Sequence, residues 1–344
     1  AIAGDKSLLH ITKPEIDFSP MLPDNDPKVY RKAIDNFAEW QKKGYLVRDS
    51  KPCYYVYAQT MGERTQYGFV LCAHCDDYAK GLIKKHELTR KDKEDDRMVH
   101  VNIQSANIEP VFFAFRTQRE LEDILYKTAS SEPEYDFTDE NGFGHKFWVI
   151  SDDALIERIT ELFSDRVDAF YIADGHHRSA AAARVGEERA AANPSHRGNE
   201  EYNYFMAVCF PDDQLKVMDY NRVVKDLNGL VPSQIIGMLG EHFDIMCQGE
   251  SVYAPSELHT FSMYLEGKWY ELKARPDTYH GADLVESLDV SILSKYVLDE
   301  ILGIKDLRRD PRIDFVGGIR GLGELKRRVD SGEMKLALAL YPVS

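Results

Sequence analysis

The sequence predicts a two-domain fold of the α+β (α/β) class. The chain has 344 residues, which is long enough for two domains that each have their own core. Hydrophobic residues make up 43% and charged residues 29%, a composition typical of globular proteins. Strand-like runs alternate with helical patterns up to about residue 225, and the pattern changes beyond it. We therefore expect a first domain at residues 1–225 and a smaller α+β domain at 226–344.

In the first domain, helices are predicted where apolar residues recur every three or four positions, and strands where β-rich or apolar runs are short. Asp26 before Pro27 is typical of a helix start, because aspartate caps the first turn and proline suits it. The predicted helices are residues 24–45, 76–85, 152–163 and 179–192. The predicted strands are residues 53–57, 65–71, 109–115, 146–150, 167–173, 205–210 and 215–224. We expect the first two strands to form one hairpin and the last two another.

The second domain is predicted on the same criteria. A short turn at Glu266-Gly267 separates two β-rich runs and indicates a hairpin. The predicted helices are residues 231–242, 290–302 and 322–329. The predicted strands are residues 261–265, 268–272, 313–316 and 335–341.

Charge and hydropathy narrow the classes of partner and the compartment. The formal net charge is −15, so the surface as a whole repels a phosphate backbone, and DNA is an unlikely main partner. No stretch approaches the roughly 20 apolar residues that span a bilayer, so we expect no membrane partner. The first residues lack the basic and apolar regions of a signal peptide, which favours a cytoplasmic protein. The oligomeric state stays open, and a homo-oligomer is compatible with the sequence.

The five cysteines are odd in number and mostly lie in apolar stretches. This pattern suits a reducing compartment better than a disulfide framework. Cys72 and Cys75 have C-x-x-C spacing, but no second pair follows at zinc-finger spacing. We expect buried or half-buried strand cysteines here, with a metal or redox role as the alternative.

The run Asp174-Gly175-His176-His177-Arg178 leads from a predicted strand into an alanine-rich helix that opens at Ser179. These residues and Ser179 are the candidate contacts for nucleotide phosphates. Glycine allows a sharp turn or a close ligand approach, and a helix start presents free N–H groups to an anion. Histidine and arginine at this end disfavour the helix unless an anion offsets their charge. Arg178 can grip phosphate oxygens, and Asp174 can orient a histidine or bind a metal ion on the phosphates. The alternative is a solvated surface turn whose aspartate caps the helix.

A densely charged run follows at residues 84–97. It can be a solvated helix with internal ion pairs, or it can line a cleft beside the strand predicted at 109–115. Phosphoryl transfer needs a carboxylate base for the attacking hydroxyl and cations for the transferred group. The candidate catalytic residues are Glu87, Glu94 and the neighbouring His86, and the candidate cations are Lys85 and Arg97.

Two later motifs carry less chemical information. Residues 219–226 place polar side chains at a strand end, which favours a simple turn. Residues 312–321 are glycine-rich after a strand, but they lack the Lys-Ser/Thr of a P-loop and the spacing of a dinucleotide fingerprint. Close packing at a strand–turn–helix corner is the favoured interpretation.

Several of these motifs occur together in one known family. The runs that carry the resemblance are residues 54–57, 85–87, 93–97, 173–178, 220–229 and 315–321. Through them the chain resembles the prokaryotic domain-of-unknown-function family one thousand and fifteen, whose members are often labelled ParB-like partition or sporulation regulators. Those members usually carry a longer stretch before the segment that resembles residues 8–17, so a site residue supplied there would be missing from the candidates.

A local similarity is more informative about chemistry. The run Asp174-Gly175-His176-His177-Arg178 is similar to the nucleotide-phosphate motif of the free-serine kinases, which have a ParB/sulfiredoxin-like fold. The resemblance implies such a fold for the first domain, and phosphate or Mg²⁺ contacts at these five residues.

Two functions are therefore expected as alternatives. The first is an enzyme that uses Mg²⁺ and ATP or ADP to phosphorylate the hydroxyl of a small metabolite, with free L-serine as the best candidate. The second is a ParB-like nucleotide-binding regulator without metabolic activity. The absence of a basic helix-turn-helix pattern and the acidic charge favour the enzyme.

Overall fold

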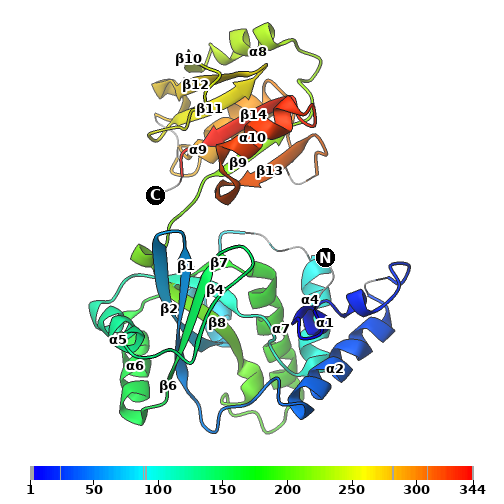
Figure 1. Cartoon of the computed structure of the whole chain (residues 1–344), viewed down its shortest axis with the longest axis vertical. Helices are drawn as coiled ribbons and strands as arrows, with labels where there is room; N and C mark the ends of the chain where they lie inside the picture. Colours follow the sequence, from blue (N-terminus) through cyan, green and yellow to red (C-terminus); the bar gives the residue numbers. More distant parts are fainter. Residues whose placement is uncertain are drawn as a thin grey trace. The chain divides into compact units, whose positions relative to one another are not determined.

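We describe the protein from a computed structural model that covers residues 4–23, 25–87, 89, 91–280, 283–307 and 309–342, with the side chain of residue 92 left out. The chain divides into two compact units, residues 1–215 and 216–344. Each unit combines helices with its own β-sheet, so the predicted α+β class is confirmed (Figure 1). Within the described residues, every helix is too short or too polar to span a bilayer.

Unit 1 is built on a mixed eight-stranded sheet with strand order β3-β7-β4-β8-β2-β1-β6-β5. The pairs β3–β7 and β4–β8 are parallel, and the remaining neighbours are antiparallel. The strands are β1 (Tyr54–Met61), β2 (Arg64–His74), β3 (Ile83–Lys84), β4 (Val111–Phe115), β5 (Tyr135–Thr138), β6 (Gly144–Ile150), β7 (Phe170–Asp174) and β8 (Tyr204–Pro211). The predicted hairpin of the first two strands is confirmed.

Helices cover both faces of this sheet (Figure 1). Helices α5 and α6 lie on one side, and α7 lies on the other, with α4, α2 and α1 beyond it. The helices of unit 1 are α1 (Leu9–Thr12), α2 (Pro27–Lys42), α3 (Cys75–Ala79), α4 (Lys91–Gln104), α5 (Arg119–Ala129), α6 (Asp153–Arg166) and α7 (His176–Ala192). Asp26 caps α2 by accepting from the Lys28 N–H, as its position before Pro27 predicts.

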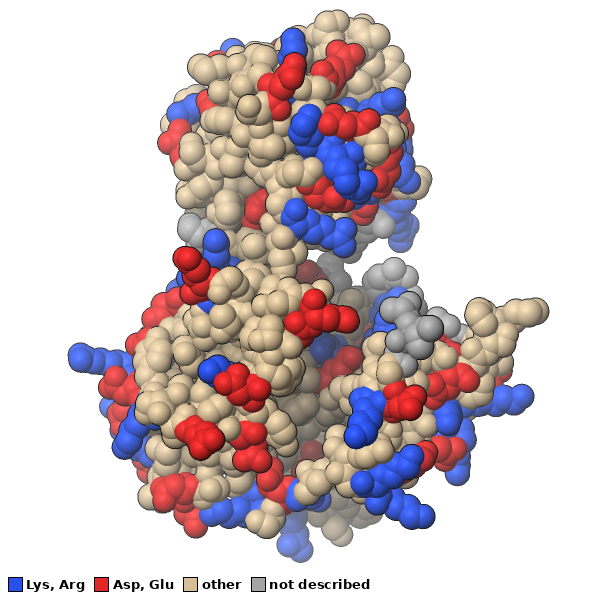
Figure 2. Space-filling model, in the orientation of Figure 1, with Lys and Arg blue, Asp and Glu red and all other residues tan. Residues whose placement is uncertain are grey.

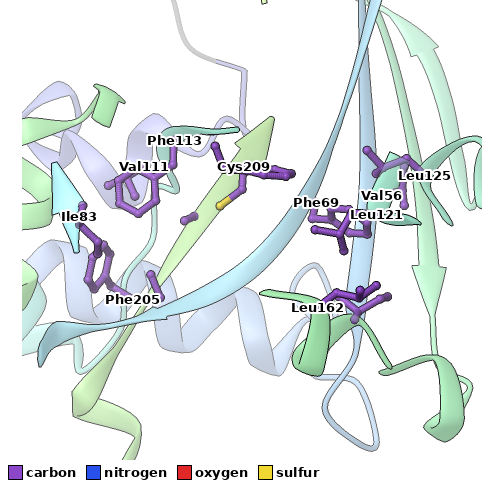
Figure 3. Packing of buried hydrophobic residues seen from close by; sticks show 14 of the residues in the cluster. Val56, Phe69, Ile83, Val111, Phe113, Leu121, Leu125, Leu162, Phe205 and Cys209 are labelled. Atoms are coloured by element: carbon purple, nitrogen blue, oxygen red, sulfur yellow. The ribbon is translucent and has the colours of Figure 1, made fainter. Parts of the chain in front are cut away.

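The core of unit 1 lies between the sheet and these helices (Figure 3). Phe113 of β4 and Phe69 of β2 are fully buried, and Leu121, Leu125 and other residues of α5 and α6 pack with them. Burying a large apolar side chain stabilises a fold by about 1.5–3 kcal/mol. This core fixes β4 and β7, the strands nearest the candidate site.

Residues 91–97 of the charged run form the start of α4, which packs on α7. Met98 and Val101, which follow the run, meet Ala181 and Val185 of α7 in a small apolar cluster. The helix can therefore bury a face because it continues beyond residue 97 into apolar residues. Its charged first turns lie beside the start of α7, close to the run Asp174-Gly175-His176-His177-Arg178, called here the DGHHR turn.

The boundary between the units differs from the prediction at residue 225. The predicted second hairpin is wrong, because residues 204–211 and 220–224 belong to different sheets. Strand β9 (Tyr220–Val224) pairs with β13 (Ile313–Gly317) and β14 (Leu336–Leu340) of unit 2. Strand β8 pairs instead with β2 and β4 of unit 1. The division therefore falls before β9, at residues 215 and 216.

Unit 2 contains an antiparallel six-stranded sheet with order β10-β12-β11-β14-β9-β13. The predicted hairpin of β11 and β12 is confirmed. Its further elements are α8 (Pro232–Leu239), β10 (Phe243–Gly249), β11 (Thr260–Leu265), β12 (Lys268–Ala274), α9 (Asp289–Leu293) and α10 (Gly321–Asp330). The predicted helix at 290–302 is observed as α9 followed by a π-helical segment, Ser294–Asp299.

The two late motifs meet in unit 2 as a packed corner. The Gly318 N–H donates to the Asp219 carbonyl at 2.7 Å. A Cβ atom at Gly318 would lie 2.8 Å from the backbone carbonyl oxygen of Asp219, too close without a backbone shift, so this corner favours glycine. The close-packing interpretation of residues 312–321 agrees with this geometry.

Charged side chains of both signs are mixed over the visible faces of the two units (Figure 2). Lysine and arginine do not form a continuous basic stripe on those faces. A basic ligand site therefore has to be sought in a local cavity.

Candidate functional site

The DGHHR run forms a tight turn between strand β7 and helix α7. Strand β7 ends at Asp174, and α7 begins at His176, so Gly175 alone makes the connection. Its φ of +94° lies in the region that favours glycine, and an added Cβ would lie 3.0 Å from Cγ1 of Val111. The Ser179 N–H donates to the Gly175 carbonyl at 2.9 Å and closes the first helical turn.

Helix α7 starts without a side-chain cap from the described residues. By contrast, Asp26 caps α2 and Asp152 caps α6. The first N–H groups of a helix need acceptors, and they attract negative charge. The start of this 17-residue helix is therefore suited to an external anion.

A cavity of about 460 Å³ opens at this helix start. Five of its lining residues come from the DGHHR turn and the other three from the charged run. The lining residues are Glu87, Lys93, Arg97, Asp174, Gly175, His176, His177 and Arg178. The structure therefore brings together two segments that are about 80 residues apart in the sequence, as the cleft interpretation of the charged run expected.

His176 is the buried histidine of the pair, with 5% of its surface exposed. Its Nδ1 atom lies 3.5 Å from Oε2 of Glu87, and its ring meets that of His86 edge to face at 4.5 Å. Burial lowers the pKa of His176, and the charge of Glu87 opposes this shift. The Nε2 atom of His176 is buried without a hydrogen-bond partner among the described residues.

Asp174 and Arg178 pair with each other across one turn. The Arg178 Nη2 atom donates to Oδ2 of Asp174 at 2.6 Å, and Nη1 donates to the Pro110 carbonyl at 2.5 Å. Glu109 lies further away, with Oε2 at 3.9 Å from Nη1. The guanidinium group is therefore held by protein acceptors at the edge of the cavity, and a phosphate has to compete with them for it.

The two candidate carboxylate bases occupy different environments. Glu87 lines the cavity, and 61% of its side chain is exposed. Glu94 accepts from Arg184 of α7 at 3.0 Å and from the Thr89 hydroxyl, and it does not line the cavity. Glu94 therefore has the contacts of a residue that joins α4 to α7.

Of the other candidates, too, some line the cavity and some do not. Arg97 lines the cavity, whereas the Lys85 ammonium group lies over the ring of Tyr78, 4.6 Å from its centre. His86 stands beside Glu87, with Nε2 3.9 Å from Oε1. Ser179 is fully buried in the second turn of α7, outside the lining, and its Oγ atom has no partner among the described residues.

Comparison with known families adds one result. The family described as "Protein of unknown function (DUF1015)" matches residues 2–291. The chain belongs to this family. The matched range includes every residue that lines the cavity, and it extends into unit 2. No curated protein and no solved structure matches the chain.

One cavity residue of this DUF1015 protein was missing from the sequence candidates. Lys93 lies four residues before Arg97 on α4, so both residues share one helix face. That spacing was visible in the sequence. Which face α4 presents to the turn depends on its packing on α7, and this packing involves Ala181 and Val185, far along the chain.

The C-x-x-C pair does not form a metal site with other described residues. Cys75 is buried at the start of α3, where its Sγ contacts the Ala182 carbonyl at 3.5 Å, while Cys72 is exposed on β2. Burial raises the pKa of the Cys75 thiol to about 12, which disfavours the reactive thiolate. The buried thiol agrees with a packing role for Cys75.

Proposed function

We propose that unit 1 is a ParB/sulfiredoxin-like nucleotide-binding domain that transfers a phosphoryl group from ATP or ADP to the hydroxyl of a small metabolite. Free L-serine is the first candidate acceptor. The observation that carries the proposal is the uncapped start of α7, which faces a cavity lined by Lys93, Arg97 and His177. Cations and helix N–H groups in one cavity are the donors that bind phosphate oxygens.

The nucleotide phosphates would lie against the first turn of α7. Its N–H groups and the lysine and arginine of α4 would hold the terminal phosphate, and Arg178 would add a donor by exchanging Asp174 for a phosphate oxygen. Mg²⁺ bound with the nucleotide would neutralise phosphate charge during transfer. Asp174 is the cavity carboxylate nearest to that role, although Oδ2 is already engaged by Arg178.

Glu87 would accept the proton of the attacking hydroxyl, because it is the glutamate that lines the cavity. The acceptor oxygen then forms a bond to the terminal phosphorus, and the bond to the bridging oxygen breaks, releasing ADP from ATP or AMP from ADP. His176 lies 3.5 Å from Glu87 and would hold its carboxylate in place. Glu94 would serve the packing of α4 on α7.

Two measurements test this proposal. The protein is incubated with Mg-ATP or Mg-ADP and L-serine, and phosphoserine is sought by mass spectrometry. The melting temperature is measured with each nucleotide in parallel. Absence of both product and thermal shift contradicts the proposal, while a thermal shift without product for any hydroxyl acceptor favours the nucleotide-binding regulator.

Charge-removing variants locate the nucleotide. We expect Lys93→Met and Arg97→Met each to weaken nucleotide binding about tenfold, the equivalent of about 1.4 kcal/mol. Arg31→Met is the matched control, because Arg31 is exposed on α2 and pairs with Asp35 one turn away. Equal affinity in all three variants would place the nucleotide elsewhere.

A further inference from the structure

A set of metal-ligating side chains lies at the cavity, two of them in its lining, and the proposed phosphate contacts do not use it. It consists of His86, Glu87 and His176, whose potential ligand atoms all lie within 4.8 Å of one another. These residues come from the loop after β3 and from the first turn of α7, so the fold brings them together. Among the described residues they are the one group of three or more histidine, cysteine or acidic side chains with this geometry.

We propose that His86, Glu87 and His176 bind a divalent transition-metal ion of the Zn²⁺ class. Two imidazoles and one carboxylate form a donor set that suits Zn²⁺ and similar ions, whereas Mg²⁺ prefers oxygen ligands alone. Three protein ligands leave a coordination position for water or a substrate atom. This site is separate from the Mg²⁺ of a nucleotide and does not rest on the proposed function.

The distances are close to those of a bound site. Zn–N and Zn–O bonds of about 2.0–2.2 Å place neighbouring ligand atoms of a tetrahedral site about 3.4 Å apart. The Nδ1 atom of His176 and Oε2 of Glu87 are already 3.5 Å apart. The side chain of His86 is 64% exposed, so it can move the remaining distance without displacing a packed neighbour.

The burial of His176 fixes one ligand of the proposed site. Only 5% of this residue is exposed, and its Nε2 atom has no partner among the described residues. The ion would bind Nδ1, the nitrogen that faces Glu87, and the burial of the ring holds this nitrogen in place, while Nε2 points away from Glu87 and is not part of the site. Lys93 and Arg97 line the same cavity, so we expect weaker binding than at a closed structural zinc site.

The proposal also defines what Glu87 does when the ion is present. With the ion bound, the Glu87 carboxylate would serve as a ligand, and the ion would lower the pKa of a hydroxyl at its open position. In the absence of the ion, Glu87 is the base described above. Metal binding is measured without nucleotide, so failure of one proposal is distinguishable from failure of the other.

The test uses Co²⁺ as a spectroscopic probe for this class of ion. The full-length protein is stripped with EDTA, dialysed and titrated with Co²⁺, and visible absorption is recorded. We expect one ion per chain, the intense d–d bands of a four- or five-coordinate site, and loss of these bands when Zn²⁺ is added.

Variants assign the ligands. We expect His86→Ala and Glu87→Gln to weaken Co²⁺ binding at least about tenfold. Both side chains are exposed, so these variants should fold even if His176→Ala does not. His242→Ala is the matched control, because it removes a histidine that pairs with Glu300 at 3.4 Å in unit 2. Absence of the bands in the native protein, or unchanged titrations in both ligand variants, overturns the proposal.

Discussion

Gly175 shows how one residue shapes the candidate site. Its positive φ lets β7 turn directly into α7, and the lack of a side chain leaves room for Val111. We expect Gly175→Ala to destabilise unit 1 by about 1–3 kcal/mol, because the new methyl group adds a close contact to backbone strain. Urea unfolding measures this change.

Gly198 provides a matched control for that substitution. It also lies in unit 1 and has a φ of +90°, but among the described residues no atom beyond its chain neighbours lies within 4 Å of an added Cβ. Gly198→Ala therefore has the strain without the contact, and we expect a smaller loss of stability. Equal losses in the two variants would show that Val111 relaxes freely and that the close contact contributes nothing.

Arg184 links two helices and contacts only one of the two candidate glutamates, Glu94, among the described residues. It joins α7 to α4 by donating to Glu94 and Asp95, each at 3.0 Å. Glu94 is largely buried, with 14% of its side chain exposed, so removal of Arg184 leaves a carboxylate without its cation. We expect a coupling free energy of about 0.5–1 kcal/mol between these two residues.

A double-mutant cycle with Arg184→Gln and Glu94→Gln measures the coupling. If phosphoryl transfer is found, Glu94→Gln should lower stability and retain most activity, whereas Glu87→Gln should lower the rate at least about a hundredfold. If Glu94→Gln instead lowers the rate and Glu87→Gln retains activity, Glu94 is the base, which contradicts the assignment of Glu87.

Tyr30 joins α2 to α4 and makes this contact sensitive to pH. Its hydroxyl donates to Oδ1 of Asp96 at 2.8 Å, and burial, together with this bond and the carboxylate charge, raises the pKa of Tyr30 to about 12. In the unfolded chain a tyrosine loses its proton near pH 10. The folded state therefore holds more protons between these values, so its stability is full below pH 10 and falls as the pH rises toward 12.

Unfolding by urea at pH values from about 9 to about 11.5 measures this loss. We expect Tyr30→Phe to make the fall in unfolding free energy with pH shallower, because phenylalanine has no proton to lose. Asp96→Asn should have an intermediate effect, since it removes the charge and keeps the burial. An unchanged slope in Tyr30→Phe would contradict the predicted contribution.

The elements that could be predicted from the sequence are those with local causes. Asp26 and Pro27 indicated the start of α2, and the glycine turn placed β7 and α7 around Gly175. Helix α5 also has a local signal, because Leu121 and Leu125 lie one turn apart. Local patterns were therefore sufficient for most helices.

Long-range pairing could not be predicted in the same way. Strand β9 follows β8 closely in the chain, yet its partners β13 and β14 lie about a hundred residues further on. Likewise, the difference between Glu87 and Glu94 depends on Arg184, which no spacing within the charged run reveals. The strand pairing and the contacts of Glu94 both depend on segments that are distant in sequence.

At the scale of the whole molecule, the two units have separate cores. The core around Phe69 and Phe113 belongs to unit 1, whereas the cores around Phe261 and Trp269 belong to unit 2. Each unit is of ordinary domain size, so each can unfold as its own cooperative transition. We expect two transitions in thermal unfolding of the full chain.

The tryptophans assign these transitions, and a ligand distinguishes them. Trp40 and Trp148 report on unit 1, and the buried Trp269 reports on unit 2. In Trp269→Phe, fluorescence should follow only the transition of unit 1, while circular dichroism still shows both.

A ligand at about 100 times its Kd adds about 2.7 kcal/mol to the unfolding free energy of the unit that binds it, which raises the melting temperature of that unit by about 5–10 °C. Because the cavity lies wholly within unit 1, Mg-ATP or Co²⁺ should shift the tryptophan-reported transition and leave the other unchanged. A single transition that moves as a whole would instead mean that the two units unfold together, and ligand binding in unit 1 would then also stabilise unit 2.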